Sequence, residues 1–251
     1  MATSKLFSLL PLLSMAVVLT LHTAMAADPL FHFCSNSGNF TPNSNYQNNL
    51  NQLLGDLYLK TPINGFGSGS AGKYSDQTYG LSLCRGDVSA ADCKSCVADA
   101  GSTLRDRCPY NKGGIIWYDN CLVKYSDEDF LGKIDNGNKF YMWNVQEVSN
   151  PEEFNRKTKE LLSELAGKAY AVKSLYATGE TELGAGGSST TSEKLYGLVQ
   201  CTRDLSGEDC KKCLDGAIGE LPNCCDAKEG GRVVGGSCNF RYEIYPFVND
   251  A

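Results

Sequence analysis

Two segments of this chain carry apolar residues at the spacing of an amphipathic helix, and the two copies lie 108 positions apart. The predicted apolar faces consist of Tyr46, Leu50, Leu53, Leu54 and Leu57 in the first copy, and of Phe154, Thr158, Leu161, Leu162 and Leu165 in the second. Asn150 and Pro151 mark the start of the second helix, because asparagine caps helices and proline fits the first turn. We expect both helices to pack one face against a core.

Each long helix is followed by a second helix and then a hairpin. Ser89 and Ser206 can each cap a helix, and an aspartate lies three residues beyond each of them. The segments 113–125 and 231–245 are rich in β-branched and aromatic residues, with glycine or Asp-Asn at the predicted turns, which is typical of hairpins.

Glycine, serine and threonine dominate residues 64–73 and 179–191, so we expect mobile loops there. Each unit is thus predicted to contain a short strand, a long helix, a glycine-rich loop, a strand, a second helix and a closing hairpin. Two helices on one face of an antiparallel sheet make an α+β domain.

The cysteines repeat together with these elements. Ten of the 12 form two sets in which 8, 2, 11 and 12 residues separate successive members. The sets lie 117 positions apart and consist of Cys84, Cys93, Cys96, Cys108 and Cys121, and of Cys201, Cys210, Cys213, Cys225 and Cys238. A Tyr-Gly-Leu triplet precedes each set, at residues 79–81 and 196–198. Shared spacing with shared flanking residues indicates a duplicated unit.

The N-terminus has the three parts of a secretory signal peptide. Lys5 is followed by an apolar run over residues 6–21 and then by the small-residue site Ala24-Met25-Ala26. The run is shorter than the ~20 apolar residues of a spanning helix. We therefore expect cleavage after residue 26, a secreted mature chain, and no membrane span.

Secretion changes the interpretation of the cysteines. The two-residue spacing of Cys93 and Cys96 also occurs in zinc sites, but in an oxidising compartment a disulfide framework is expected first. Loss of residues 1–26 removes one basic residue and no acid, so the formal net charge changes from −6 to −7. An acidic surface argues against nucleic acid and anionic membranes as partners.

With these motifs the chain resembles the plant ginkbilobin-type domain, also called domain of unknown function twenty-six or the salt stress response/antifungal domain. The resemblance rests on the cysteine spacing, the Tyr-Gly-Leu triplets and the segments 230–233 and 241–247. Two copies after a signal peptide are similar to a plant cysteine-rich repeat secretory protein. The resemblance implies two tandem α+β domains stapled by disulfides, each a five-stranded antiparallel sheet packed by two helices. We place them at 27–130 and 139–251, joined by a linker at 131–138.

The resemblance also implies a disulfide pattern that spacing alone cannot select. Carried onto this chain, it pairs Cys34 with Cys108, Cys84 with Cys93, Cys96 with Cys121, Cys201 with Cys210, and Cys213 with Cys238. The second unit departs from the pattern, because Trp143 stands where the first unit has Cys34, and an extra Cys224 adjoins Cys225. These two cysteines could form a vicinal bond, remain thiols or pair elsewhere.

The resemblance also implies a mannose site, because ginkbilobin-like members bind mannose through an asparagine, an arginine and a glutamate. The matching positions in the second unit hold Asn144, Arg232 and Glu243. An amide, a guanidinium and a carboxylate can together satisfy vicinal sugar hydroxyls. Trp143 and Tyr242 could add a stacking face. The alternative is structural: a cross-strand ion pair of Arg232 with Glu243, and an asparagine bonded to local backbone.

In the first unit Ser35, Ile115 and Ser126 occupy these positions, so we expect no mannose site there.

From the sequence we assign no catalytic residue, no cofactor and no metal site. After cleavage His32 is the single histidine, in a predicted strand, and hydrolase and phosphate-binding motifs are absent. The acid pairs at 152–153 and 127–129 are expected to be solvated surface. Asn39 heads the one Asn-x-Thr sequon and is a candidate for N-glycosylation.

Three function classes follow. The first is a noncatalytic apoplastic protein that binds mannose or mannan-type glycans in plant defence, with an antifungal role. The second is an extracellular interaction module that partners receptor-like kinases without sugar. The third is a redox sensor based on Cys224 and Cys225.

Overall fold

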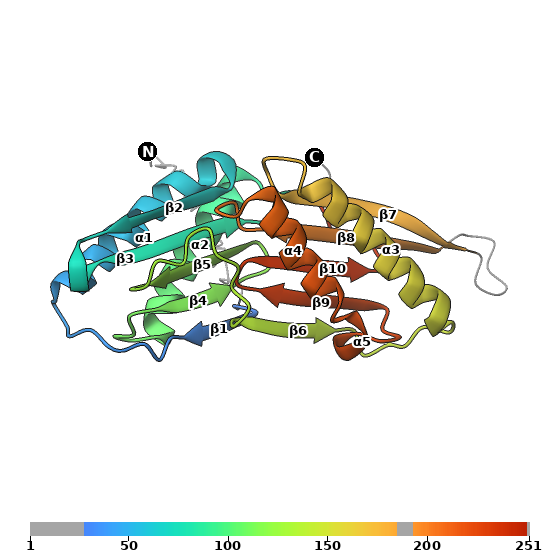
Figure 1. Ribbon diagram of the computed structural model, residues 1–251, viewed down its shortest axis with the longest axis horizontal. Coiled ribbons are helices and arrows are strands. Elements are labelled where there is room, and N and C mark those ends of the chain that lie inside the picture. Colours follow the sequence, from blue (N-terminus) through green and yellow to red (C-terminus); the bar gives the residue numbers. More distant parts are fainter. Residues whose placement is uncertain (1–27, 185–192, 250–251) are drawn as a thin grey trace, which may run out of the picture.

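A computed structural model describes residues 28–184 and 193–249, which form two units of the same design (Figure 1). In the first unit the elements are β1 (Phe31–Cys34), α1 (Asn45–Asn64), β2 (Phe66–Ala71), the 3-10 turn η1 (Tyr74–Asp76), β3 (Thr78–Cys84), α2 (Ala90–Arg107), β4 (Gly114–Trp117) and β5 (Cys121–Ser126). Its antiparallel sheet has the order β1-β4-β5-β3-β2.

The second unit repeats this sheet in the order β6-β9-β10-β8-β7. Its elements are β6 (Lys139–Trp143), α3 (Pro151–Ala169), β7 (Tyr176–Gly184), β8 (Glu193–Cys201), α4 (Gly207–Ile218), α5 (Leu221–Cys224), β9 (Gly230–Gly235) and β10 (Cys238–Glu243). The predicted fold class, two tandem α+β domains with five-stranded sheets, is confirmed.

Local sequence signals placed the helix starts correctly. Ser89 and Ser206 cap α2 and α4, and Asn150 caps α3 with Pro151 in its first turn. Each cap side chain accepts a hydrogen bond from the backbone N–H three residues on, which satisfies a donor that the helix leaves free. The predicted apolar faces of α1 and α3 are buried, apart from the half-buried Leu54.

The predicted glycine-rich loop at residues 64–73 is wrong for most of its length, because residues 66–71 form the edge strand β2. Its glycines permit close packing: a Cβ on Gly67 would lie 2.5 Å from Thr61 Oγ1 of α1. Apolar alternation is missing from this strand, so its sequence resembled a loop. Residues 179–184 likewise belong to β7, and the rest of that predicted loop lies outside the described residues.

All five disulfides implied by the family resemblance are present, with Cα–Cα distances of 5.4–6.1 Å. Cys93 and Cys96 bond to different partners, which accounts for their spacing without a metal. Cys224 and Cys225, left open by the sequence, form a vicinal disulfide. Strand register confirms the reason: Trp143 pairs with Gly231 as Cys34 pairs with Gly114, so Cys225 has no distant partner.

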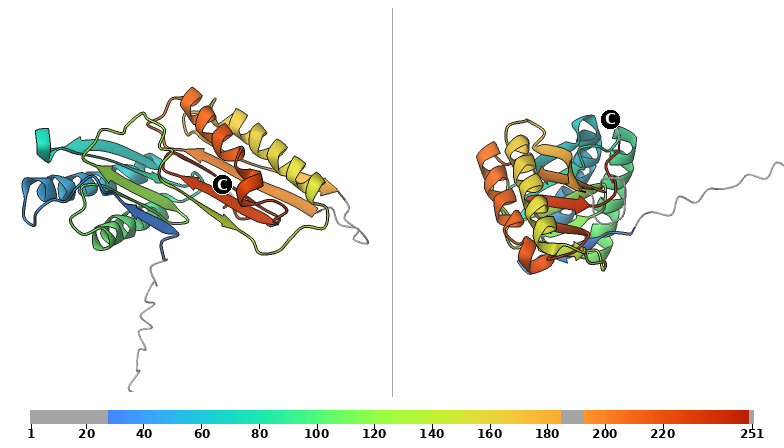
Figure 2. Two further views of the ribbon diagram at one scale, coloured as in Figure 1. Left: turned by 60° about the horizontal axis from the view of Figure 1, so that its bottom comes forward. Right: turned by 90° about the vertical axis from the view of Figure 1, so that its right-hand side faces the viewer.

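The two units pack with their helices on the outside and their sheets between (Figure 2). The uncovered sheet faces meet in an apolar cluster in which Ile115 and Trp117 of the first unit adjoin Phe140 and Val234 of the second. Trp117 Nε1 also donates to Gly235 O at 3.1 Å. In the segment between the units, the partly buried Asp135 accepts from the buried Lys124 Nζ at 2.7 Å. The junction is therefore both apolar and hydrogen-bonded.

Candidate functional site

Asn144 and Glu243 lie in one row across three strands of the second sheet. The Asn144 backbone N–H donates to Gly230 O at 2.8 Å, and Gly230 is paired directly with Glu243 across β9 and β10. The Glu243 carboxylate folds over Gly230, where a Cβ would overlap it. Glycine at position 230 thus lets the acid reach toward β6. Two of the three predicted sugar-binding residues are brought together in this way.

Arg232 lies on the same sheet face, two residues along β9 and directly opposite Arg241 of β10. Facing arginines would repel each other. Each has its own carboxylate, however, because Arg241 Nε donates to Glu243 Oε1 at 2.9 Å and Arg232 is ion-paired with Asp119. The expected Arg232–Glu243 pair is therefore not formed. Arg241, which the sequence did not single out for this role, takes its place.

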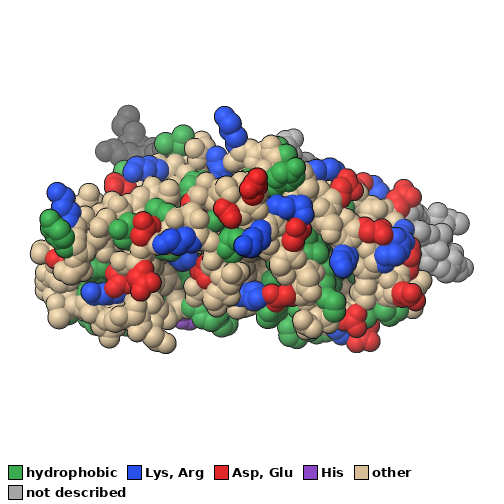
Figure 3. Space-filling view, viewed as in Figure 1, with side chains coloured by type: hydrophobic (Ala, Val, Ile, Leu, Met, Phe, Trp, Pro, Cys, Tyr) green, Lys and Arg blue, Asp and Glu red, His purple; other side chains and the backbone are tan. Residues whose placement is uncertain are grey.

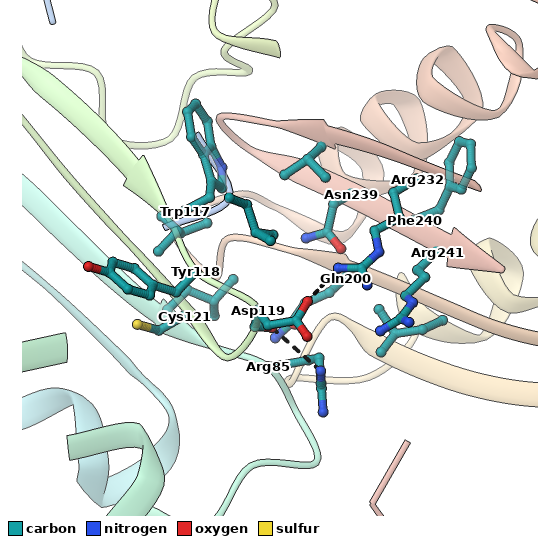
Figure 4. Close-up of a pocket in the computed structure, with 15 residues that line it drawn as sticks. Arg85, Trp117, Tyr118, Asp119, Cys121, Gln200, Arg232, Asn239, Phe240 and Arg241 are labelled. Carbon is teal, nitrogen blue, oxygen red and sulfur yellow. Dashed lines mark hydrogen bonds and ion pairs between the residues drawn. The ribbon is translucent and has the colours of Figure 1, made fainter. Parts of the chain in front are cut away.

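Asp119 comes from the other unit, in the turn between β4 and β5. Its side chain is half exposed, whereas that of Arg232 is largely buried. Arg85 reaches the same turn and is ion-paired with Asp87 at 2.6 Å. A 60 Å³ cavity between the units is lined by Arg85, Asp119, Arg232 and Arg241, whose side chains are shown in Figure 4. The arginine of the predicted triad is thus part of the contact between domains.

The C-terminal segment closes one side of this cluster. The Phe247 ring lies 4.1 Å from the Arg241 guanidinium, a cation–π contact. Asn249 then crosses to the first unit, where its backbone N–H donates to Asp87 Oδ2 at 2.8 Å. Residues 244–249 therefore hold Arg241 and Asp87 in place from opposite ends.

Ion pairing sets the charge state of the two aspartates. Burial by itself raises the pKa of Asp87 and Asp119, but the hydrogen bonds and charges of Arg85 and Arg232, respectively, bring both pKa values below the usual range. Both carboxylates are thus ionised at neutral and mildly acidic pH.

We expect stability to fall in acid because of these pairs. A carboxyl group whose pKa is lowered by folding stabilises the folded state above its unfolded pKa, about 3.9 for aspartate, and loses that contribution as pH falls through the folded value. The midpoint of urea unfolding should therefore be lower at pH 3 than at pH 6. Asp119→Asn should make this decrease smaller. Equal midpoints at the two pH values would contradict the prediction.

The proposed stacking face is absent, because Trp143 and Tyr242 both lie on the sheet face opposite Arg232 and Glu243. Tyr242 is buried on the helix side of the sheet, where its hydroxyl donates to Cys225 O and Lys228 O. It cannot stack on a sugar at the opposite face, so this expectation is wrong. Trp143 is 53% exposed, but it pairs with Gly231, as Tyr242 does, so it shares the face of Tyr242 and not that of Glu243. Asn144 Oδ1 accepts from the Gln146 backbone N–H at 3.0 Å, the local bond expected by the structural alternative.

The other candidate residues have ordinary surroundings. His32 lies in β1, and burial, followed by the Arg107 charge, lowers its pKa. Glu153 pairs with Arg156 on the surface of α3. In the first unit Ile115 is buried in the cluster between the sheets. Asn39 is exposed, and its glycosylation stays a prediction.

The sequence could not have indicated Asp119, because its partner lies 113 residues away in the other unit. Arg241 and Asp87 stand within the repeated motifs, but nothing local showed that both contact the C-terminal segment, Arg241 through Phe247 and Asp87 through Asn249.

Comparison with known proteins agrees with this architecture. Residues 33–128 and 143–245 match the salt stress response/antifungal family. An antimicrobial ginkbilobin-2-like protein of Castanea crenata is 62% identical over 92% of this chain and 93% of its own. Cysteine-rich repeat secretory protein 38 of Arabidopsis thaliana is 53% identical over the full length of both.

Solved structures show the same tandem arrangement. The tandem DUF26 ectodomains of two Arabidopsis thaliana cysteine-rich receptor-like proteins superpose with TM-scores of 0.72 and 0.69, at 26% and 27% identity. Each covers 87% of this chain, and the match spans 98% and 100% of theirs. In the part of the chain that the structure describes, no helix is long and apolar enough to cross a membrane. With both units matched and relatives similar over nearly their whole length, the chain belongs to the salt stress response/antifungal family of cysteine-rich repeat secretory proteins.

Proposed function

We propose that this chain is a noncatalytic carbohydrate-binding protein of plant defence that binds mannose or mannan-type glycans through Asn144, Arg232 and Glu243. The protein is secreted, in agreement with its N-terminal sequence and its secretory relatives. The antimicrobial relative supports an antifungal role in the apoplast.

The observation that carries the proposal is the row formed by Asn144, Gly230 and Glu243. The Asn144 amide follows β6 and the buried Glu243 carboxylate belongs to β10, and the only residue between them in this row is Gly230 of β9, which has no side chain. Arg232 completes a donor and acceptor set on one polar face. Such convergent groups suit vicinal hydroxyls, which need both a donor and an acceptor.

Asp119 must then compete with the sugar for Arg232. The aspartate is half exposed, so its ion pair contributes little, about 0.2–1 kcal/mol. A ligand hydroxyl can therefore replace it at small cost.

Two variants that break the same ion pair should consequently have opposite effects on sugar binding. Arg232→Ala removes a sugar-binding donor and should abolish measurable binding of mannan. Asp119→Ala frees the same donor and should raise affinity by about 1.4- to fivefold, the equivalent of that ion pair. Calorimetry with methyl mannoside and a mannan-coated biosensor surface measure both effects.

Ser35→Ala is the matched control, because Ser35 is the first unit's counterpart of Asn144 and should leave binding unchanged. Gly230→Ala supplies an independent check, since its methyl group would displace the Glu243 carboxylate and weaken binding. Wild-type protein that binds no mannoside or mannan, or an Arg232→Ala variant that binds as well as wild type, would refute the sugar site.

A second candidate is an interaction module that partners extracellular receptor-like kinases without sugar. Its support is the edge strand β6, along which Tyr141, Trp143 and the adjoining Val145 are 39%, 53% and 80% exposed. An edge strand with apolar side chains offers both backbone groups and contact area to another protein. This function would survive a failure of every glycan test. Cys224 and Cys225 are joined in a disulfide, so a redox sensor would have to act through reduction of this bond. The redox-sensor hypothesis stays a prediction.

A further inference from the structure

The second helix differs between the two units, and a cavity lies beside it in the second unit. Helix α2 continues to Arg107, whereas its counterpart α4 ends at Ile218 and the chain turns into the four-residue α5. Pro222 in the first turn of α5 has no N–H with which to continue α4. A cavity of 220 Å³ lies between α3 and the α4–α5 segment.

The inner wall of this cavity is apolar. Ile218 and Cys225 are buried there, and Tyr242 contributes its ring, since its hydroxyl is already bonded to backbone carbonyls. Leu221 and Pro222 form the outer wall. In the space-filling view hydrophobic side chains are visible between α3 and α4, among scattered charges of both signs (Figure 3).

In the first unit a hydrogen bond spans the corresponding groove. Arg105 of α2 donates to Asn51 of α1 at 2.9 Å. By the two repeat offsets, these positions become Pro222 and Lys159 in the second unit. Proline cannot donate and lysine cannot accept, so the bridge is lost. The substitutions leave the cavity mouth open and place an ammonium group at its rim.

Lys159 is the cation at this mouth that is free to bind a ligand. Arg156 beside it is held by Glu153 and Glu160, and Asp226 accepts a hydrogen bond from Asn155. Within the described residues, no carboxylate lies at ion-pair distance from Lys159. The site thus combines an apolar interior with one unpaired positive charge.

We propose that this cavity binds a small aromatic carboxylate, with its ring against Cys225 and Tyr242 and its carboxylate on Lys159. An apolar cavity of about 150 Å³ can hold benzene, so 220 Å³ accommodates one substituted ring. Sulfur and ring edges make favourable contacts with an aromatic face. The charged group stays at the mouth, where it keeps part of its hydration. This site lies on the opposite side of the sheet from the proposed sugar site and does not depend on it.

Benzoate and its neutral isostere benzamide are the probes for this site. Ligand-observed NMR and calorimetry on the oxidised mature protein should show saturable benzoate binding that is about tenfold tighter than benzamide binding, because charge-assisted hydrogen bonds are roughly twice as strong as neutral ones. Lys159→Gln should weaken benzoate binding by about the same factor and leave benzamide unchanged. Lys168→Gln removes another exposed charge near the end of the same helix, where Lys168 pairs with Glu164, and as the control it should change neither.

A second pair of variants tests the cavity itself. Ile218→Trp should fill it and abolish binding of both probes, and the double change Lys159→Asn with Pro222→Arg should restore the first unit's bridge and close the mouth. Circular dichroism and a free-thiol assay establish that each variant is folded and oxidised. Absence of saturable benzoate binding to wild type would overturn the site. Equal binding of benzoate to wild type and to folded Lys159→Gln would overturn the role of the lysine, and with it the proposed ligand class.

Discussion

Replacing Cys34 and Cys108 together by alanine is expected to lower the free energy of unfolding by about 4 kcal/mol. This disulfide joins residues 74 positions apart, the largest separation among the six bonds. In the chain-entropy description a longer closed loop restricts the unfolded chain more, so its loss costs more. The bond also ties the edge strand β1 to the end of α2, where no other covalent link holds the strand. Urea unfolding of the oxidised variant, followed by tryptophan fluorescence, measures the effect.

The control for this prediction is the double change of Cys224 and Cys225 to alanine. Their bond joins adjacent residues and closes almost no loop, so its removal should cost only about 1 kcal/mol, mainly from the buried sulfur of Cys225. Removing the Cys213–Cys238 bond, which joins residues 25 positions apart, should lower the free energy of unfolding by an amount between these two values. A similar loss for the vicinal and the 74-residue bond would rule out loop closure as the origin of the stabilisation.

Sequence reasoning was most successful where the relevant forces are local. Helix stripes and caps depend on residues within one or two turns, so α1, α3 and the starts of α2 and α4 were predicted from the chain itself. The edge strand β2 was missed because its Gly-Ser sequence forms a strand only through pairing with β3. Its hydrogen-bond partners are not encoded nearby, and the low strand propensity of glycine suggested a loop.

The candidate sugar site shows the same limit. Asn144, Arg232 and Glu243 came from the family resemblance, and the register of β9 with β10 shows that Arg232 and Glu243 share a face. The pairing of Arg232 with Asp119 depends on how two units pack, which no periodicity within one unit reports. The vicinal bond was left open for a related reason: it is the consequence of a partner lost 82 residues earlier, at Trp143.

Gly86→Ala is expected to destabilise the folded chain by about 2 kcal/mol, because it forces a methyl group into the junction between the units. A Cβ at this position would lie 2.5 Å from Tyr176 Cδ1 and 2.7 Å from Cδ2, so the ring of the second unit must move away. The junction nearby is rigid, since Gln200 Nε2 donates to Cys84 O in a buried hydrogen bond at 3.0 Å. Thermal and urea unfolding measure the change, and small-angle scattering detects any separation of the units.

Gly101→Ala provides the matched control, with the opposite sign expected. Gly101 lies inside α2, and a Cβ there would have no neighbour within 4 Å, so the change should stabilise the protein by about 0.5–1 kcal/mol through helix propensity. The same substitution thus tests packing at one position and backbone entropy at the other. If Gly86→Ala proved neutral, the contact with Tyr176 would have to be loose, and the units would be free to shift relative to each other. In that case the ion pair of Arg232 with Asp119 could open through movement of the units, without a competing ligand. Asp119→Ala would then not give the predicted gain in sugar affinity.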